Sequence, residues 1–132
     1  MNTDSITETF GPVISAYTRK QALADGFQVD ASVTANEAGI KFPTFINRSV
    51  YEQFVSVPAK VCGQDVSGRL WDVLWMLRHG IGKSQGGPVI HFDLYVRNDN
   101  RRAKLVRLKA MCGPLDIDDP QPAITVMLPT ED

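Results

Sequence analysis

The fold of this chain is decided by residues 67–81, which read SGRLWDVLWMLRHGI. Apolar side chains recur there at helical spacing and form one stripe, made of Leu70, Val73, Leu74, Leu77 and Ile81. Trp71 and Trp75 stand four residues apart and form a second stripe beside the first. A helix that is apolar over more than half of its circumference must be covered on more than one side. The pattern therefore predicts a central core helix, with a sheet on one flank, short helices on the other, and both tryptophans in the core.

The remaining face of this helix carries Arg69, Asp72 and His79. Arg69 and Asp72 are three residues apart, a spacing at which opposite charges pair on a helix surface. His79 falls close to the predicted C-terminus, where a cation complements the helix dipole, so a capping role is favoured over a catalytic one.

The C-terminal part of the chain changes from helical to alternating spacing. Apolar residues occupy every second position in three runs, at 90–96, 106–112 and 124–128, which is typical of strands with one buried face. The third run is expected to return after a proline-containing loop at 113–122. The three runs predict an antiparallel sheet.

The first two of these runs predict a hairpin closed by residues 98–102. A slip of one residue would move every apolar side chain to the other face, so the buried face sets the register. The expected partners are Leu94 with Val106, Phe92 with Leu108, and Ile90 with Ala110. The same register places Asp93 opposite Arg107 on the outer face, which is a favourable pair of opposite charges.

Short helices are predicted in the N-terminal half. Capping boxes at 18–21, 34–37 and 49–52 predict three helix starts. Gly26 and Gly39 follow the first two of these helices and are expected to take the positive φ of a helix C-terminus.

Two further segments have the character of strands. Residues 27–30 alternate apolar with polar, and residues 42–46 contain a proline that suits an edge strand. The sequence leaves open whether either one joins the sheet. Residues 1–10 are expected to be loosely ordered until Phe10 docks.

The overall composition is that of an ordinary globular domain. The chain has 132 residues, 43% of them hydrophobic and 22% charged, with a formal net charge of −1. This length predicts a single domain over residues 1–132, and the small net charge excludes a global attraction to nucleic acid or membranes. No apolar run approaches the roughly 18 residues of a membrane span, and the N-terminus lacks the order of a signal peptide. We therefore expect a cytoplasmic protein in which Cys62 and Cys112 are free thiols.

The residue types that carry catalysis or bind metals are scattered. Cys62, Cys112, His79 and His91 show no ligand-like spacing, and we interpret them as core thiols and unrelated histidines. A phosphate-binding glycine loop and a GxSxG motif are both lacking. The sequence therefore predicts no catalytic residue, no metal and no cofactor. An enzyme whose active site the sequence does not reveal stays as an alternative.

The candidate site with the strongest pattern is a basic stretch along the predicted hairpin. Its cations that would contact nucleic acid are Arg97, Arg101, Arg102, Lys104 and Arg107. A basic two-stranded ribbon can enter a nucleic-acid groove. The competing interpretation is a solvated outer face that discourages aggregation at the sheet edge. Few aromatic residues are interleaved with these cations, so stacking on single strands is poorly supported.

Three stretches carry a family resemblance. They lie at 11–30, beginning GPVISAYTRKQALADG and ending VD, at 38–43, AGIKFP, and at 68–74, GRLWDVL. Together they resemble a family of small uncharacterised bacterial proteins that plasmids, prophages and other mobile elements often encode. The resemblance brings no established activity, so no functional residue is carried over. It implies a cytoplasmic protein of an accessory gene pool, and it favours binding roles, such as interference with a host or defence factor, over central metabolism.

These observations combine into one expectation. The fold class is α+β: an antiparallel sheet of three strands, or four or five if the two further segments join, packs on a central helix with short N-terminal helices. The expected function is non-enzymatic binding of another macromolecule, above all a protein. Nucleic-acid binding by the basic hairpin at 97–109 is the first alternative, and the hidden enzyme is the second.

Overall fold

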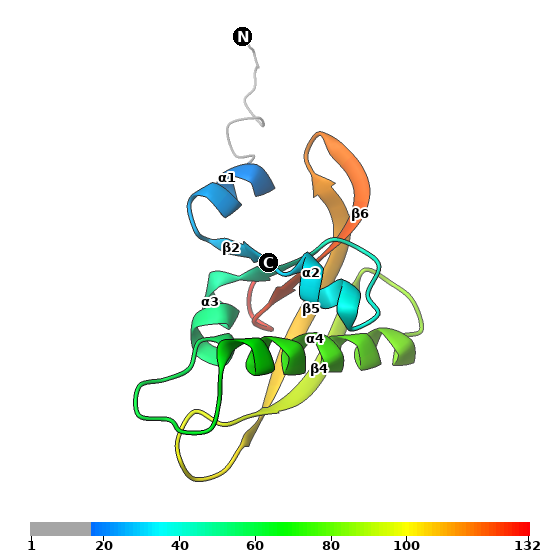
Figure 1. Ribbon diagram of the computed structural model, residues 1–132. Coiled ribbons are helices and arrows are strands. Elements are labelled where there is room, and N and C mark those ends of the chain that lie inside the picture. Colours follow the sequence, from blue (N-terminus) through cyan, green and yellow to red (C-terminus); the bar gives the residue numbers. More distant parts are fainter. Residues whose placement is uncertain (1–16) are drawn as a thin grey trace.

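The computed structural model describes residues 17–132, and the expectations for residues 1–16 lie outside this part of the chain. The helices are α1 (Arg19–Ala24), α2 (Ser32–Glu37), α3 (Arg48–Val50), the π-helical η2 (Tyr51–Val55) and α4 (Val66–Lys83). The strands are β2 (Gln28–Asp30), β3 (Thr44–Asn47), β4 (Val89–Val96), β5 (Lys104–Asp116) and β6 (Asp119–Met127) (Figure 1). The fold is α+β, and the helix expected at 67–81 agrees with α4.

The five strands form one mixed sheet in the order β2-β3-β6-β5-β4. The prediction of a purely antiparallel sheet is wrong, because β3 pairs with β6 in parallel, with Thr44 opposite Ile124 and Ile46 opposite Val126. Both strand-like segments of the N-terminal half join the sheet, as β2 and β3. Partners of a parallel pair are joined by long connections, so no local pattern pointed to this pairing.

The hairpin of β4 and β5 has the predicted register. Ile90 faces Ala110, Phe92 faces Leu108 and Leu94 faces Val106. The prediction of a loop at 113–122 is wrong. The strand β5 continues to Asp116, β6 begins at Asp119, and the two remain paired as a ribbon over these residues. Pro114 and Pro122 lie opposite each other in this ribbon. The Cys112 N–H donates to the Pro88 carbonyl at 2.7 Å, so the backbone N–H and C=O groups of the even-numbered residues of β5 point toward β4. Pro114 is even-numbered, and its missing N–H therefore costs the β5–β6 ladder no hydrogen bond.

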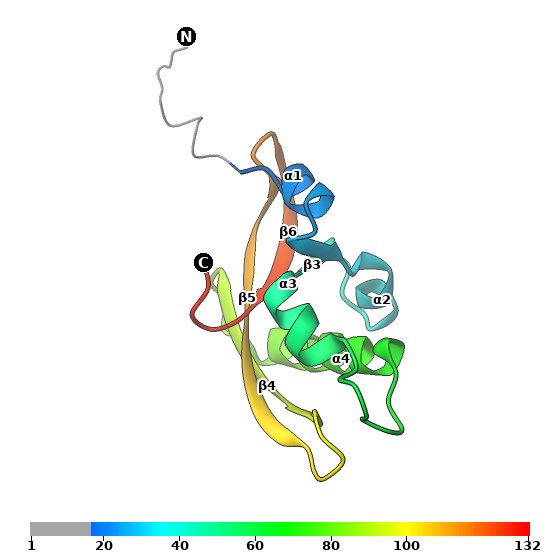
Figure 2. The same cartoon turned by 90° about the vertical axis from the view of Figure 1, so that its left-hand side faces the viewer.

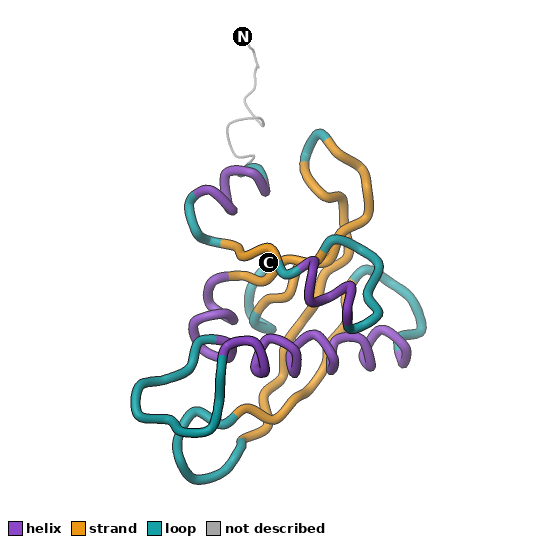
Figure 3. The backbone as a smooth tube through the Cα atoms, in the orientation of Figure 1, coloured by secondary structure: helices purple, strands orange, loops and turns teal. Residues whose placement is uncertain are grey.

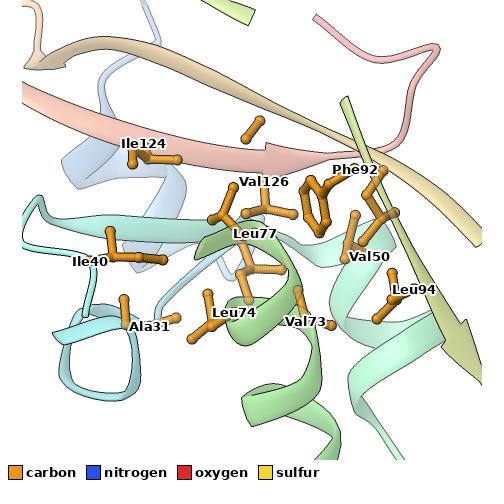
Figure 4. Packing of buried hydrophobic residues seen from close by; sticks show 14 of the residues in the cluster. Ala31, Ile40, Val50, Val73, Leu74, Leu77, Phe92, Leu94, Ile124 and Val126 are labelled. Carbon is orange, nitrogen blue, oxygen red and sulfur yellow. The ribbon is translucent and has the colours of Figure 1, made fainter. Parts of the chain in front are cut away.

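The helices α2, α3 and α4 lie on one side of the sheet (Figure 2). Between α4 and the sheet lies a buried cluster to which α4 contributes Val73, Leu74 and Leu77. The strands contribute large side chains to the same cluster, among them Phe92 and Leu94 (Figure 4). This burial is the main source of stability that the chain offers, because apolar area removed from water is the dominant favourable term in folding.

The tryptophans are not part of this core. Trp71 is 37% exposed and Trp75 is 42% exposed, so the prediction that short helices cover them is wrong. The helices α2 and η2 do contact α4, but they leave the tryptophan stripe open. Spacing on a helix tells which residues share a face, whereas long-range packing decides whether that face is covered.

Of the three predicted capping boxes, only the first is present. Thr18 and Gln21 form the full reciprocal capping box of α1. The prediction that a capping box at 34–37 starts a helix is wrong, since α2 begins at Ser32 without a side-chain cap. The box at 49–52 is also wrong: the Ser49 hydroxyl donates to Glu131 at 2.7 Å, and the helix begins at Arg48.

The turn after α1 offers a clean test of backbone conformation. Gly26 has φ of 78°, as expected for a helix C-terminus, and no atom lies within 4 Å of the position that a Cβ would take. Gly26→Val is expected to lower the free energy of unfolding by about 1–2 kcal/mol, and Gly26→Asn by less, because asparagine tolerates positive φ and a β-branched residue does not. Urea denaturation of the two variants measures the difference. Equal stabilities of the two variants would contradict the assignment of a positive φ to Gly26.

Candidate interaction surface

Some cations of the basic hairpin bind other groups of the chain, and others have no such partner in the described part. Arg107 pairs with Asp93 across the strands, with its Nε atom 2.9 Å from the carboxylate, as the register predicted. The hydrogen bond from Arg107 lowers the pKa of Asp93. Arg97 directly follows β4, and its guanidinium donates to the carbonyls of Cys62 and Asp99.

The cations at the hairpin tip have a different environment. Arg101, Arg102 and Lys104 are exposed, and their side chains make no hydrogen bond or ion pair with other residues of the described part, 17–132. Of the five basic residues singled out in the sequence, three therefore remain available to a polyanion.

Arg69 is the residue whose role the sequence concealed most completely. Its position on α4 predicted a surface pair with Asp72, but the side chain is 5% exposed. The guanidinium makes five hydrogen bonds, all to uncharged oxygens, and none goes to a carboxylate. The acceptors are the carbonyls of Val55 at 3.2 Å, Gln53 at 3.5 Å and Arg97 at 2.8 Å, and the side-chain oxygens of Gln64 at 2.8 Å and Asn98 at 2.7 Å. Burial is the main cause that lowers the pKa of Arg69, and the nearby charge of Arg97 adds to it.

The position of Gln53 and Val55 at the end of η2 explains why their carbonyls can accept hydrogen bonds from Arg69. Gln53 and Val55 lie in the last turn of η2, and the final carbonyls of a helix have no partner within it. The negative end of the helix dipole also points there and suits a cation. No linear pattern marks such an arginine, because its acceptors come from three separate segments.

Side-chain amides complete the connection between the loop before α4 and the hairpin tip. Asn100 accepts from the Cys62 N–H at 2.9 Å and donates to the Lys60 carbonyl at 2.6 Å. Gln64 donates to the Arg97 carbonyl at 3.0 Å, and Asn98 to the Gln53 carbonyl at 2.9 Å. Figure 3 shows the two loops beside each other, below and to the left of α4. The network holds the end of β4 at a defined place against the start of α4.

An aromatic ladder runs along the outside of α4. The rings of Trp71 and Trp75 stack with centroids 5.6 Å apart and an interplanar angle of 13°. The His79 ring meets Trp75 edge-on at 5.0 Å. The helix continues to Lys83, so His79 is not its C-terminal cap as predicted. Exposed aromatic side chains of this size are enriched in protein interfaces.

The strand β4 forms one edge of the sheet. Because Pro88 and Cys112 are joined by a hydrogen bond, the even-numbered residues of β4 point their backbone groups toward β5. The odd-numbered residues 89, 91, 93 and 95 therefore direct their N–H and C=O groups to the open edge. An unpaired edge of this kind is a template for another strand.

Two hollows lie between α4 and this edge. The Trp71 hollow, of about 470 Å³, is lined by residues that include Gln64, Trp71, Asp72, Tyr95 and Arg97. The His79 hollow, of about 480 Å³, is lined by residues that include Met76, His79, Lys83, His91 and Asp93. We call the aromatic ladder, the open edge and these two hollows the α4–β4 surface. The sequence suggested its helical face and its edge strand separately, and the tertiary structure brings them together.

The potential metal ligands and the two cysteines are placed as follows in the described part of the chain. Within residues 17–132 no group of three His, Cys, Asp or Glu side chains could hold a metal ion. Cys62 and Cys112 are free and exposed, so their interpretation as core thiols is wrong. No helix in these residues has the length and apolar character that crossing a bilayer requires.

Comparison with known proteins adds no further identification. No protein-family model, no curated protein and no solved structure matches this chain.

Proposed function

We propose that this chain is a non-enzymatic protein that binds another protein through the α4–β4 surface. The observation that supports this best is the exposed stack of Trp71 on Trp75 beside the open edge of β4. Tryptophan is among the residues that contribute most to binding energy in protein interfaces. The Arg69 network stabilises the same surface at one end, which lowers the cost of ordering it when a partner binds.

The resemblance to proteins of mobile elements agrees with this proposal. A cytoplasmic accessory protein that captures a host or defence factor requires a preformed surface rather than a catalytic centre.

A comparison of two double variants tests the proposed function. Trp71→Ala with Trp75→Ala removes the aromatic ladder, while Val33→Ala with Ile117→Ala removes apolar side chains that are 78% and 66% exposed elsewhere. We expect a partner that co-purifies with the wild-type chain and with the control, and is lost from the tryptophan variant. Mass spectrometry of the bound proteins measures this. A partner set that both variants retain equally would contradict the proposed surface.

Nucleic-acid binding is the second candidate, and the free tip cations Arg101, Arg102 and Lys104 are the observation in its favour. Three phosphate contacts would give a slope of log affinity against log salt of about −2.7 on duplex DNA. We expect no salt-dependent binding at physiological ionic strength, because Arg97 and Arg107 are engaged within the chain. Titration of labelled duplexes at several salt concentrations decides this. Micromolar binding that is lost on replacing Arg101 and Arg102 by alanine would reverse the ranking.

A further inference from the structure

We infer that the α4–β4 surface takes an extended segment of its partner, which adds to the open edge of β4 and places a lysine or arginine beside Trp71 and Asp72. This inference rests on the proposed function and specifies the chemistry of the partner. It follows from the backbone geometry of β4, the wall that α4 forms beside it, and the charges at one end.

The backbone of β4 provides the first part of the recognition. The residues at 89, 91, 93 and 95 present their N–H and C=O groups in the plane of the sheet, away from β5. A chain lying along this edge would pair with alternate residues, and such main-chain bonds hold any sequence that can extend. The edge is not blunted by a proline, because β4 reads VIHFDLYV.

The helix α4 provides a wall beside that edge. Asp72, Met76, His79 and Lys83 follow one another at helical spacing and all line the two hollows. Gly80 lets the helix approach the strand, since a Cβ there would lie 3.1 Å from the Cβ of Phe92. A strand added to β4 would therefore direct every second side chain toward α4 and into a hollow.

The charges at the Trp71 end indicate which side chain fits. The Asp72 carboxylate has no cation within 4 Å among residues 17–132, because Arg69 gives its hydrogen bonds to carbonyl and amide oxygens. Burial raises the pKa of Asp72, an effect that the neighbouring Arg69 charge partly opposes. The other charges that line this hollow are already engaged: Asp65 accepts from the Gly68 N–H at 2.7 Å, and Arg97 donates to carbonyls.

A cation from the partner could interact with both Asp72 and Trp71 in the Trp71 hollow. It would pair with the Asp72 carboxylate, and it would lie against the Trp71 indole, the best aromatic face for a cation–π contact. An acidic side chain in the same place would face the Asp65 and Asp72 carboxylates, while the two arginines of the hollow, Arg69 and Arg97, already donate to carbonyl and amide oxygens. The site therefore selects an extended segment that carries a basic residue at one fixed position.

Selection from a displayed library of random ten-residue peptides, with the full chain as bait, tests the charge preference. We expect enrichment of lysine or arginine at one position of otherwise extended, partly apolar sequences. Asp72→Asn removes the charge with little change of shape and is expected to weaken the selected peptides about five- to tenfold. Enrichment that is the same with wild-type and Asp72→Asn baits would overturn the charge assignment.

A matched pair of variants tests the strand addition. His91→Pro removes an N–H that faces only the open edge, while His91→Ala keeps it. We expect His91→Pro to weaken a selected peptide at least about tenfold relative to His91→Ala, since main-chain bonds hold the segment. If His91→Pro does not fold, N-methylation of single amides in the peptide replaces it, and loss of binding should alternate along the peptide.

The outcomes separate this inference from the proposed function. Peptides that bind both His91 variants equally and show no alternation would overturn strand addition. A partner protein that still requires Trp71 and Trp75 would leave the proposed function standing in that case. A wild-type chain that sediments as a dimer, with His91→Pro monomeric, would make a second copy the occupant and overturn the inference of a separate basic segment.

Discussion

Replacing Arg69 by methionine is expected to lower the free energy of unfolding by about 3–5 kcal/mol. Methionine fills much of the same space but donates no hydrogen bond. Arg69 is only 5% exposed, and its removal would leave the buried Val55 carbonyl without its donor. The side-chain oxygen of Asn98 would also lose its donor, and the Arg97 carbonyl would keep only Gln64. A buried acceptor without a partner costs its full desolvation energy. Urea denaturation, with the slope checked against the wild type, measures the loss.

The control is a second arginine on the same helix. Arg78 is exposed on α4, so Arg78→Met is expected to change stability by less than about 0.5 kcal/mol. Arg69→Lys is expected to lose more than half of what methionine loses, because one ammonium group cannot reach acceptors that the planar guanidinium spans. Equal stabilities of the variants at 69 and 78 would show that the hydrogen bonds of Arg69 contribute nothing net.

Replacing Leu74 by alanine is expected to cost about 2–5 kcal/mol, the range for a large-to-small change in a packed core. Leu74 has no exposed surface and lies in the buried cluster between α4 and the strands. The loss combines the transfer energy of the removed methyl and methylene groups with the cavity that remains.

The matched control for this change is Leu105→Ala, which removes the same atoms from a side chain that is 59% exposed. We expect it to cost less than about 0.5 kcal/mol. Thermal and urea denaturation of both variants compare them directly. A Leu74→Ala variant as stable as Leu105→Ala would mean that α4 presents a different face to the sheet.

The sequence alone determined the features whose partners are close along the chain. The β4–β5 register followed from alternation of apolar residues across a short turn, with Asp93 opposite Arg107 as an independent check. The positive φ of Gly26 and the box of Thr18 with Gln21 depend on residues within one helical turn. Such features are set by local sterics and hydrogen bonding, so the pattern of a few residues predicts them where no distant group competes, as Glu131 does for Ser49.

The tertiary structure alone decided the features that need partners from distant segments. The parallel pairing of β3 with β6 joins residues about 80 positions apart, as Thr44 with Ile124. Arg69 was assigned to the surface because its acceptors at 53, 55 and 97 cannot be read from its own helix. Trp71 and Trp75 have the spacing of a core stripe, but no helix or strand of the described part packs over them. Helical spacing defines a face, and only the packing of the whole chain decides whether that face meets a core or solvent.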